Sequence, residues 1–194
     1  MLAVGTGNQV RSPAIERLLA ARLGAAYRTR RAPSGLPPAV VVASAGTQAV
    51  AGTPLPADVA WFLTDHGGDP AGFEARPLTP AMVRAAHLVI TTTGAVRAEV
   101  TARHPSATVR TFTLRELARL VHGLDPTSLP GTGATTADRL ARLVPLAHTR
   151  RVQVPPGRAQ DDLVEPLPDD DASRRRALDQ VLRAVRTVAG VVRA

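Results

Sequence analysis

The sequence predicts a three-layer α/β/α fold around a central four-stranded parallel sheet, and three observations support this prediction. Short apolar runs alternate with longer segments of helical periodicity, which is typical of strands joined by helical crossovers. A length of 194 residues with 44% hydrophobic content is enough to bury one substantial core. No internal repeat or linker divides the chain, so we expect a single domain over residues 1–194.

Four short runs of apolar and β-branched residues predict the strands. We place them near residues 2–4, 39–43, 87–91 and 108–112. At least one helical segment separates each run from the next. We therefore expect the strands to be parallel and the helices to cover both faces of the sheet.

Seven segments with helical spacing predict the helices. These lie near residues 13–24, 56–67, 79–86, 94–103, 113–122, 135–148 and 172–192. Pro13 suits the start of the first helix, because the N–H that proline lacks is one that a helix start leaves unbonded. In Thr113–Leu120 the apolar residues recur at helical spacing, so we expect this helix to cover the sheet.

The stretch from Val4 to Glu16 joins the first predicted strand to the first predicted helix and is the most informative part of the chain. Gly5 and Gly7 are expected to let backbone N–H groups converge on one point, because glycine tolerates positive φ. The helix adds its positive N-terminal end, and Arg11 adds a planar fork for two oxygens of a phosphate or similar oxyanion. We therefore predict an oxyanion-binding loop made of Gly5, Thr6, Gly7, Asn8, Gln9, Val10, Arg11 and Ser12.

Three residues of this loop also have ordinary structural interpretations. Arg11 could be a surface arginine at a helix start, although a cation there is unfavourable beside the positive helix end unless an anion is present. Asn8 could be a turn residue, since asparagine tolerates left-handed geometry, and it could also brace the loop. Ser12 could simply cap the helix that Pro13 opens.

The same stretch resembles the signature of the low-molecular-weight protein tyrosine phosphatase family, V-C-x-G-N-x-C-R-S-P-x-A-E. Gly7-Asn8, Arg11-Ser12-Pro13 and Glu16 match that signature. The resemblance implies the family's fold, with the phosphate held by the loop between the first strand and the first helix.

The resemblance continues through most of the chain. Ser44-Ala45-Gly46-Thr47 resembles the family's S-A-G-T turn, which implies that Ser44 supports the loop. Ala75–Thr79 resembles its A-R-x-L-T segment, and Asp161–Pro166 resembles its D-D-I-x-D-P segment. The chain is longer than the family core, and we expect the excess to form a helical insertion at about 113–157.

The chain departs from the family at the positions that carry its chemistry. Gly5 stands where the family has its nucleophilic cysteine, and the chain contains no cysteine. Glycine has no side chain that could attack phosphorus. Glu165 stands in place of the aspartate that acts as general acid in the family. Val10, Phe73 and Leu167 replace a second cysteine, a loop-bracing histidine and a cleft-lining aromatic residue.

Three functions are compatible with these residues. We favour a pseudophosphatase that binds phosphate, a phosphorylated peptide or another oxyanion without cysteine-dependent turnover. The second is an enzyme with a changed mechanism on a phosphorylated or anionic small molecule, using Glu165 or Thr6, although no base is visible beside Thr6. The third is a non-catalytic interaction scaffold. For Glu165, a solvated acidic loop paired with the arginines at 174–176 is the structural alternative.

Composition limits the partners and the cellular location. The net charge of +8 comes from arginines spread over the predicted helices, which argues against nucleic acid and favours encounter with anionic ligands. The histidines have no metal-ligand spacing, so we expect neither a metal nor another cofactor. The chain has no run long enough to span a bilayer and no secretory leader, so we expect a cytoplasmic protein without membrane contact.

Overall fold

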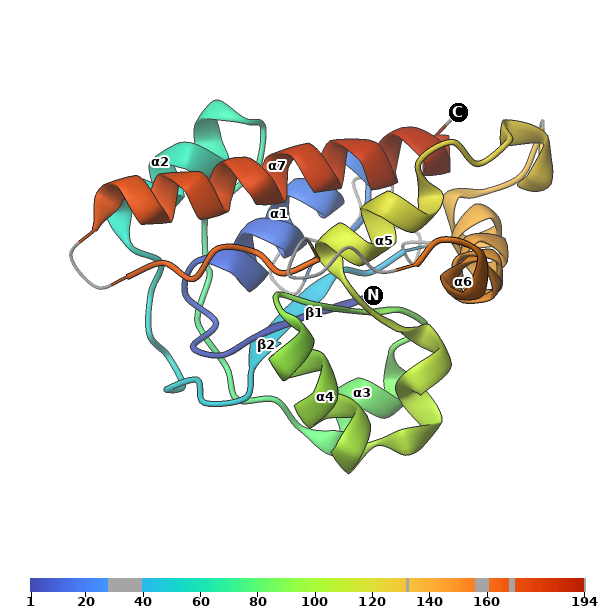
Figure 1. Ribbon diagram of the computed structural model, residues 1–194. Helices are drawn as coiled ribbons and strands as arrows, with labels where there is room; N and C mark the ends of the chain where they lie inside the picture. The colour runs from blue at the N-terminus through green and yellow to red at the C-terminus, as the bar shows by residue number, and fades with distance from the viewer. Residues whose placement is uncertain (28–39, 132, 156–160, 168–169, 194) are drawn as a thin grey trace.

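The computed structural model describes residues 1–27, 40–131, 133–155, 161–167 and 170–193. Within them, a four-stranded sheet consists of β1 (Leu2–Gly5), β2 (Ala43–Gly46), β3 (Val89–Thr91) and β4 (Thr111–Thr113). All neighbouring strands are parallel and their order is β2-β1-β3-β4. The predicted three-layer α/β/α architecture is confirmed (Figure 1).

The helices begin and end close to the predicted positions. They are α1 (Arg11–Leu23), α2 (Ala57–Asp65), α3 (Pro80–Ala85), α4 (Gly94–Arg103), α5 (Leu114–Val121), α6 (Thr136–Gln153) and α7 (Asp171–Arg193), with 3-10 turns at Pro105–Arg110 and Pro126–Ser128. Local caps explain several starts. At α5, the Thr113 hydroxyl accepts from the Glu116 N–H while the Glu116 carboxylate accepts from the Thr113 N–H, which forms a capping box.

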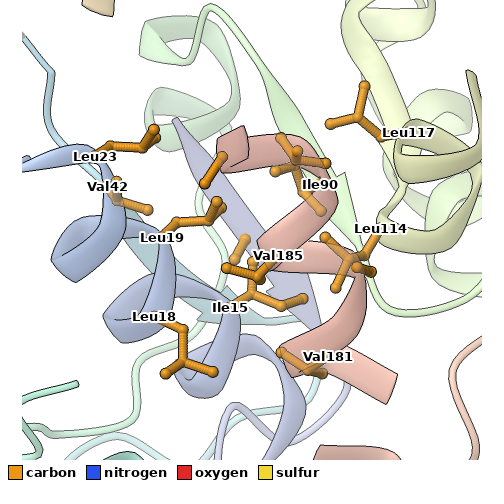
Figure 2. Close-up of a cluster of buried hydrophobic side chains, with 14 of the residues drawn as sticks. Ile15, Leu18, Leu19, Leu23, Val42, Ile90, Leu114, Leu117, Val181 and Val185 are labelled. Carbon is orange, nitrogen blue, oxygen red and sulfur yellow. The ribbon is translucent and has the colours of Figure 1, made fainter. Parts of the chain in front are cut away.

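Hydrophobic clusters on both faces of the sheet hold the layers together. Along β1, Ala3 belongs to the larger cluster with α1, α5 and α7, whereas Leu2 and Val4 belong to the smaller cluster with α3 and α4. This alternation follows the period of two in a strand. Figure 2 shows the larger cluster, in which Ile15 and Leu18 of α1 lie close to Val181 and Val185 of α7.

Two strands lie further along the chain than predicted. The prediction of a strand at 39–43 is wrong by several residues, because the pairing with β1 begins only at Ala43. Within the predicted range, Val41 forms only an isolated bridge with Ala26, and residue 39 lies outside the described part of the chain. The predicted strand at 108–112 begins three residues late, because residues 105–110 form a 3-10 turn that starts at a proline.

The remaining differences concern the C-terminal half. Helix α6 continues to Gln153, beyond the predicted end, although Pro145 lies inside it. The expected insertion at about 113–157 stays a prediction. Within that segment, α5 places Leu114 and Leu117 fully in the larger core. Among the described residues, no helix combines the length and the apolar character needed to cross a lipid bilayer.

Candidate functional site

Residues 5–12, called the 5–12 loop from here on, run from the carboxyl end of β1 into α1. Strand β1 lies between β2 and β3, so the strand order changes direction here, and such switch points are where open α/β sheets bind ligands. All eight loop residues line one cavity of about 170 Å³ together with Glu165 and Pro166. The structure thus brings the predicted oxyanion-binding residues and the predicted general-acid position together.

Asn8 shapes the turn of this loop. Its φ of 55° lies in the left-handed region, which asparagine enters more readily than most residues with a side chain. Its Nδ2 donates to Ser12 Oγ (3.1 Å) and to Ser44 Oγ (3.0 Å), and its Oδ1 accepts from the backbone N–H of Arg76 (2.9 Å). Asn8 is therefore both a turn residue and a brace, with all three bonds directed away from solvent.

The glycine that the loop needs is Gly46, at the end of β2. A β carbon on Gly46 would lie 2.4 Å from the carbonyl oxygen of Thr6 and 2.9 Å from the backbone nitrogen of Asn8. Both are backbone atoms, so neither can swing aside. The prediction that Gly5 and Gly7 supply positive φ is wrong, because Asn8 takes that conformation and neither glycine does.

Ser44 and Glu16 form the floor beneath Asn8. The Ser44 hydroxyl, which is fully buried, donates to the Glu16 carboxylate. Burial raises the pKa of the Glu16 carboxyl above its usual value, while the Ser44 hydrogen bond and the charges of Arg17 and Arg76 oppose that rise. Arg76 also donates from Nε to the carbonyl oxygen of Ser44 (2.6 Å). Sequence reasoning quoted Glu16 and Arg76 only as motif matches and gave them no role.

The start of α1 leaves donors free toward the cavity. The helix begins at Arg11, and its N-cap residue is Val10, which provides no side-chain cap. The alternative interpretation of Ser12 as the cap of this helix is wrong, because Ser12 lies inside the first turn and its hydroxyl accepts from Asn8. Among the described residues, no oxygen accepts from the backbone N–H groups of residues 6–10. An uncapped helix start of this kind favours an anion.

Arg11 and Glu165 meet across the cavity. Arg11 Nη2 lies 2.5 Å from Glu165 Oε1, and Arg11 Nη1 donates to the carbonyl oxygen of Val164 at 3.5 Å. The Arg11 side chain is only 6% exposed, whereas that of Glu165 is 63% exposed. Arg11 is therefore not a surface arginine, and the carboxylate of Glu165 reaches its guanidinium.

The side chains of Ser12 and Thr92 lie close to the place that a side chain at Gly5 would occupy. A β carbon there would lie 3.0 Å from Ser12 Oγ and 3.3 Å from Thr92 Cγ2, which is slightly tighter than ordinary contact. A larger residue would need these two side chains to shift by a few tenths of an ångström. Thr6 lines the cavity, but the one carboxylate among the described lining residues, Glu165, is bonded to Arg11.

The three residues at 161–163, which precede Glu165 in the chain, are bonded to α5, to the start of α4 and to the residue after β3. Asp161 pairs with Arg119 of α5 at 2.7 Å, and this hydrogen bond raises the pKa of Arg119. Asp162 Oδ1 accepts from the N–H of Gly94 (2.6 Å), and the N–H of Leu163 donates to the carbonyl oxygen of Thr92 (3.0 Å). Sequence reasoning missed Arg119, because nothing in its helical pattern marks a partner so distant in the chain.

Phe73, the acidic residues before α7 and the histidines were also singled out in the sequence, and their positions are as follows. Phe73 is buried, and the Arg17 guanidinium lies 5.6 Å from its ring centre and 3.9 Å from that of Tyr27. Phe73 therefore packs against an arginine of α1. Asp170 lies 3.9 Å from Arg176, but Glu165 pairs with Arg11, so the alternative that placed Glu165 in an acidic loop paired with the arginines at 174–176 is wrong for that residue. Across the described residues, no cluster of three His, Asp or Glu side chains is placed to hold a metal ion.

Comparison with solved structures agrees with this architecture. A YwlE mutant from Bacillus subtilis aligns with a TM-score of 0.63 at 19% identity, over 100% of this chain and 97% of that one. The YwlE arginine phosphatase from Geobacillus stearothermophilus aligns with a TM-score of 0.61 at 20% identity, over 97% of this chain and 89% of that one. At this level of identity the likeness shows a shared fold.

Sequence comparison establishes the family. A probable low molecular weight protein-tyrosine-phosphatase, EpsP, from Ralstonia solanacearum is 34% identical over 117 residues, which cover 60% of this chain and 71% of that protein. Its counterpart from Ralstonia nicotianae is 32% identical over the same shares. The family model of low molecular weight phosphotyrosine protein phosphatases matches residues 1–126. The chain therefore belongs to the low molecular weight phosphotyrosine protein phosphatase family.

Proposed function

We propose that the 5–12 loop binds phosphate or a related oxyanion and that the protein does not carry out the cysteine chemistry of its family. The observation that carries the proposal is the position of Arg11. Its guanidinium is almost fully buried, lines the cavity, and lies at the uncapped start of α1. A cation in that position is unfavourable unless an anion shares the site, because the helix end is itself positive. In this structure the largely exposed Glu165 carboxylate is that anion. The backbone N–H groups of residues 6–10 have no acceptor among the described residues, and these donors support the binding of a ligand oxyanion beside the pair.

The relatives support the choice of ligand class. By name, they are phosphatases acting on protein tyrosine or on arginine, so the group common to their substrates is a phosphoryl group. A cavity of about 170 Å³ is below the usual size of a pocket for a drug-sized ligand, and it suits one tetrahedral oxyanion.

The absence of cysteine removes the family's nucleophile. Covalent catalysis of this kind needs a thiolate aimed at phosphorus, and Gly5 has no side chain. The changed-mechanism alternative would need Glu165 or Thr6 to activate a nucleophile. Because the Glu165 carboxylate is held by Arg11, it would have to leave that pair before acting as a base.

The test is calorimetric titration of the purified protein with inorganic phosphate. We expect saturable binding that is lost in Arg11→Ala and in Arg11→Gln, the second of which keeps most of the side-chain length. Arg103→Ala is the control for the loss of one positive charge, since Arg103 also pairs with a glutamate, Glu99 on α4, but is exposed and lies outside the cavity. Phosphate binding by the Arg11 variants at native affinity, or no binding by the native protein, would overturn the proposal.

A scaffold without a working anion site would show no phosphate binding in any of these proteins. The changed-mechanism enzyme would show turnover of a generic aryl phosphate that falls in Glu165→Gln. If the native protein binds phosphate but does not hydrolyse the aryl phosphate, the result supports our proposal and excludes both alternatives.

A further inference from the structure

The cavity holds a carboxylate beside the cation that would bind the ligand. Glu165 Oε1 lies 2.5 Å from Arg11 Nη2, and both side chains line the same small space. Among the described residues of that lining, these are the only ionisable side chains, so they cancel each other's charge. A ligand oxygen that binds Arg11 therefore also approaches the carboxylate of Glu165.

The chemistry of a carboxylate limits what that oxygen can be. An ionised carboxylate only accepts hydrogen bonds, so a neighbouring ligand oxygen must donate one. An oxyanion that still carries a proton can do so and gains a charge-assisted hydrogen bond. A fully ionised oxyanion has no proton to offer, and it meets like-charge repulsion in a partly desolvated site.

We propose that Glu165 determines specificity by selecting oxyanions that carry a proton, such as inorganic hydrogen phosphate, over those that carry none, such as sulfate. This inference rests on the proposed function and narrows it. It also ranks phosphate esters, because a phosphomonoester loses its last proton with a pKa of about 6 and is a dianion at neutral pH. Inorganic phosphate keeps a proton there, so free phosphate is favoured over the esters.

The backbone around Glu165 keeps its carboxylate at the cavity. The N–H of Val164 donates to Oε1 of Gln180 on α7 (2.9 Å), the N–H of Leu163 donates to the carbonyl oxygen of Thr92 (3.0 Å), and Pro166 restricts the chain on the other side. Glutamate is one methylene longer than aspartate, and its carboxylate reaches Arg11 across the cavity. The backbone that carries Glu165 is thus held by bonds that do not depend on the ligand, and the carboxylate itself is held at the cavity by Arg11.

The test compares inorganic phosphate, sulfate and phenyl phosphate by calorimetry at neutral pH and constant ionic strength. In the native protein we expect phosphate to bind more tightly than sulfate or phenyl phosphate by about tenfold or more, the usual worth of one charge-assisted hydrogen bond. In Glu165→Gln we expect sulfate binding to strengthen, phosphate binding to weaken, and the ratio to approach one. Glu99→Gln, which alters a carboxylate outside the cavity, should keep the native ratio.

Two results would overturn the inference while leaving the proposed function intact. The first is equal affinity for phosphate and sulfate in the native protein, with both lost in Arg11→Ala. The second is a parallel gain for all three ligands in Glu165→Gln, which would mean that the ligand displaces the carboxylate. By contrast, absence of any phosphate binding by the native protein would reject the proposed function itself. Because Glu165 is 63% exposed, the variant should fold normally.

Discussion

The underside of the 5–12 loop is a continuous hydrogen-bond network, whereas its cavity face carries one ion pair and, at position 5, a glycine. The underside network consists of Asn8, Ser12, Ser44, Glu16 and Arg76, joined by bonds that run from the loop through β2 to α1. On the cavity face, Gly5 is bare and Arg11 is bonded to Glu165.

The difference teaches that the shape of this loop and its chemistry depend on separate residues. Asn8, Ser12, Ser44 and Glu16 of the underside network are buried, and Arg76 is half-buried. Removing one of the buried groups therefore leaves unpaired polar groups away from water. Residues of the cavity face line the proposed ligand site, and Glu165 remains largely in solvent. Changes below the loop should therefore alter stability, and changes above it should alter ligand binding.

The largest effect should come from Gly46→Ala. The new methyl group would lie 2.4 Å from a backbone oxygen of the loop, and relief requires β2 and the loop to separate. We expect a loss of about 4 kcal/mol or more in the free energy of unfolding, measured by urea denaturation. Gly7→Ala is the matched control: nothing lies within 4 Å of its β position, and its φ is not positive.

For Gly7→Ala we expect no loss and at most a gain of about 1 kcal/mol, because alanine restricts the unfolded chain. Equal stability of the two variants would show that β2 and the loop are not tightly apposed.

The next largest effect should come from Asn8. Asn8→Ala removes the amide that bonds Ser12, Ser44 and Arg76, and alanine tolerates the left-handed conformation less well than asparagine, whose polar side chain can bond locally. We expect a loss of roughly 2–4 kcal/mol in urea unfolding. Asn8→Gly lacks the same amide but tolerates the conformation, so it should be about 1 kcal/mol more stable than the alanine variant. A loss below about 0.5 kcal/mol in both variants would contradict the bracing role.

A smaller, pH-dependent effect should come from Glu16. Its pKa is raised in the folded state, chiefly by burial, so the folded protein holds this proton more tightly than the unfolded chain does. The contribution to stability is therefore fully present below the ordinary glutamate pKa and is lost as pH rises through the raised one. Glu16→Gln should remove this decline, which urea titrations across the acid-to-neutral range would detect. Identical pH profiles for the two proteins would argue against it.

The smallest effect on stability should come from the same substitution on the cavity face. Glu165→Gln breaks an ion pair whose carboxylate is mostly solvated, so we expect a change below about 0.5 kcal/mol in the free energy of unfolding. A loss comparable to that of Asn8→Ala would mean that the Arg11–Glu165 pair supports the fold, and the contrast between the two faces would fail.

Much of the fold could be predicted from the sequence because its signals are local. The run Leu2–Val4, the leucines of α5 and the proline near the start of α1 each indicate an element without knowledge of its neighbours. Strand β2 could not be placed so well. The valines at 40–42 were expected to pair with β1, but the small residues of Ala43–Gly46 form that pairing instead.

The site could be predicted in composition but not in geometry. The motif indicated which residues surround the cavity, yet the conformational roles of Asn8 and Gly46 depend on how closely β2 approaches the loop. The pair between Arg11 and Glu165 joins residues 154 positions apart, and no periodicity reports such a contact. The Ser12 cap failed for a related reason, since Asn8 already uses that hydroxyl.

The most direct measurement is turnover of a generic aryl phosphate by the native protein and by Gly5→Cys. The underside network keeps the loop in shape, and a β carbon at position 5 needs only small shifts of Ser12 and Thr92. We therefore expect no turnover by the native protein and measurable, saturable turnover by the cysteine variant. Adding Arg11→Ala to the cysteine variant should abolish that turnover. Turnover by the native protein would contradict the central claim that the missing cysteine removes phosphatase activity. A folded cysteine variant that binds phosphate and stays inert would contradict the claim that the 5–12 loop still supports that chemistry.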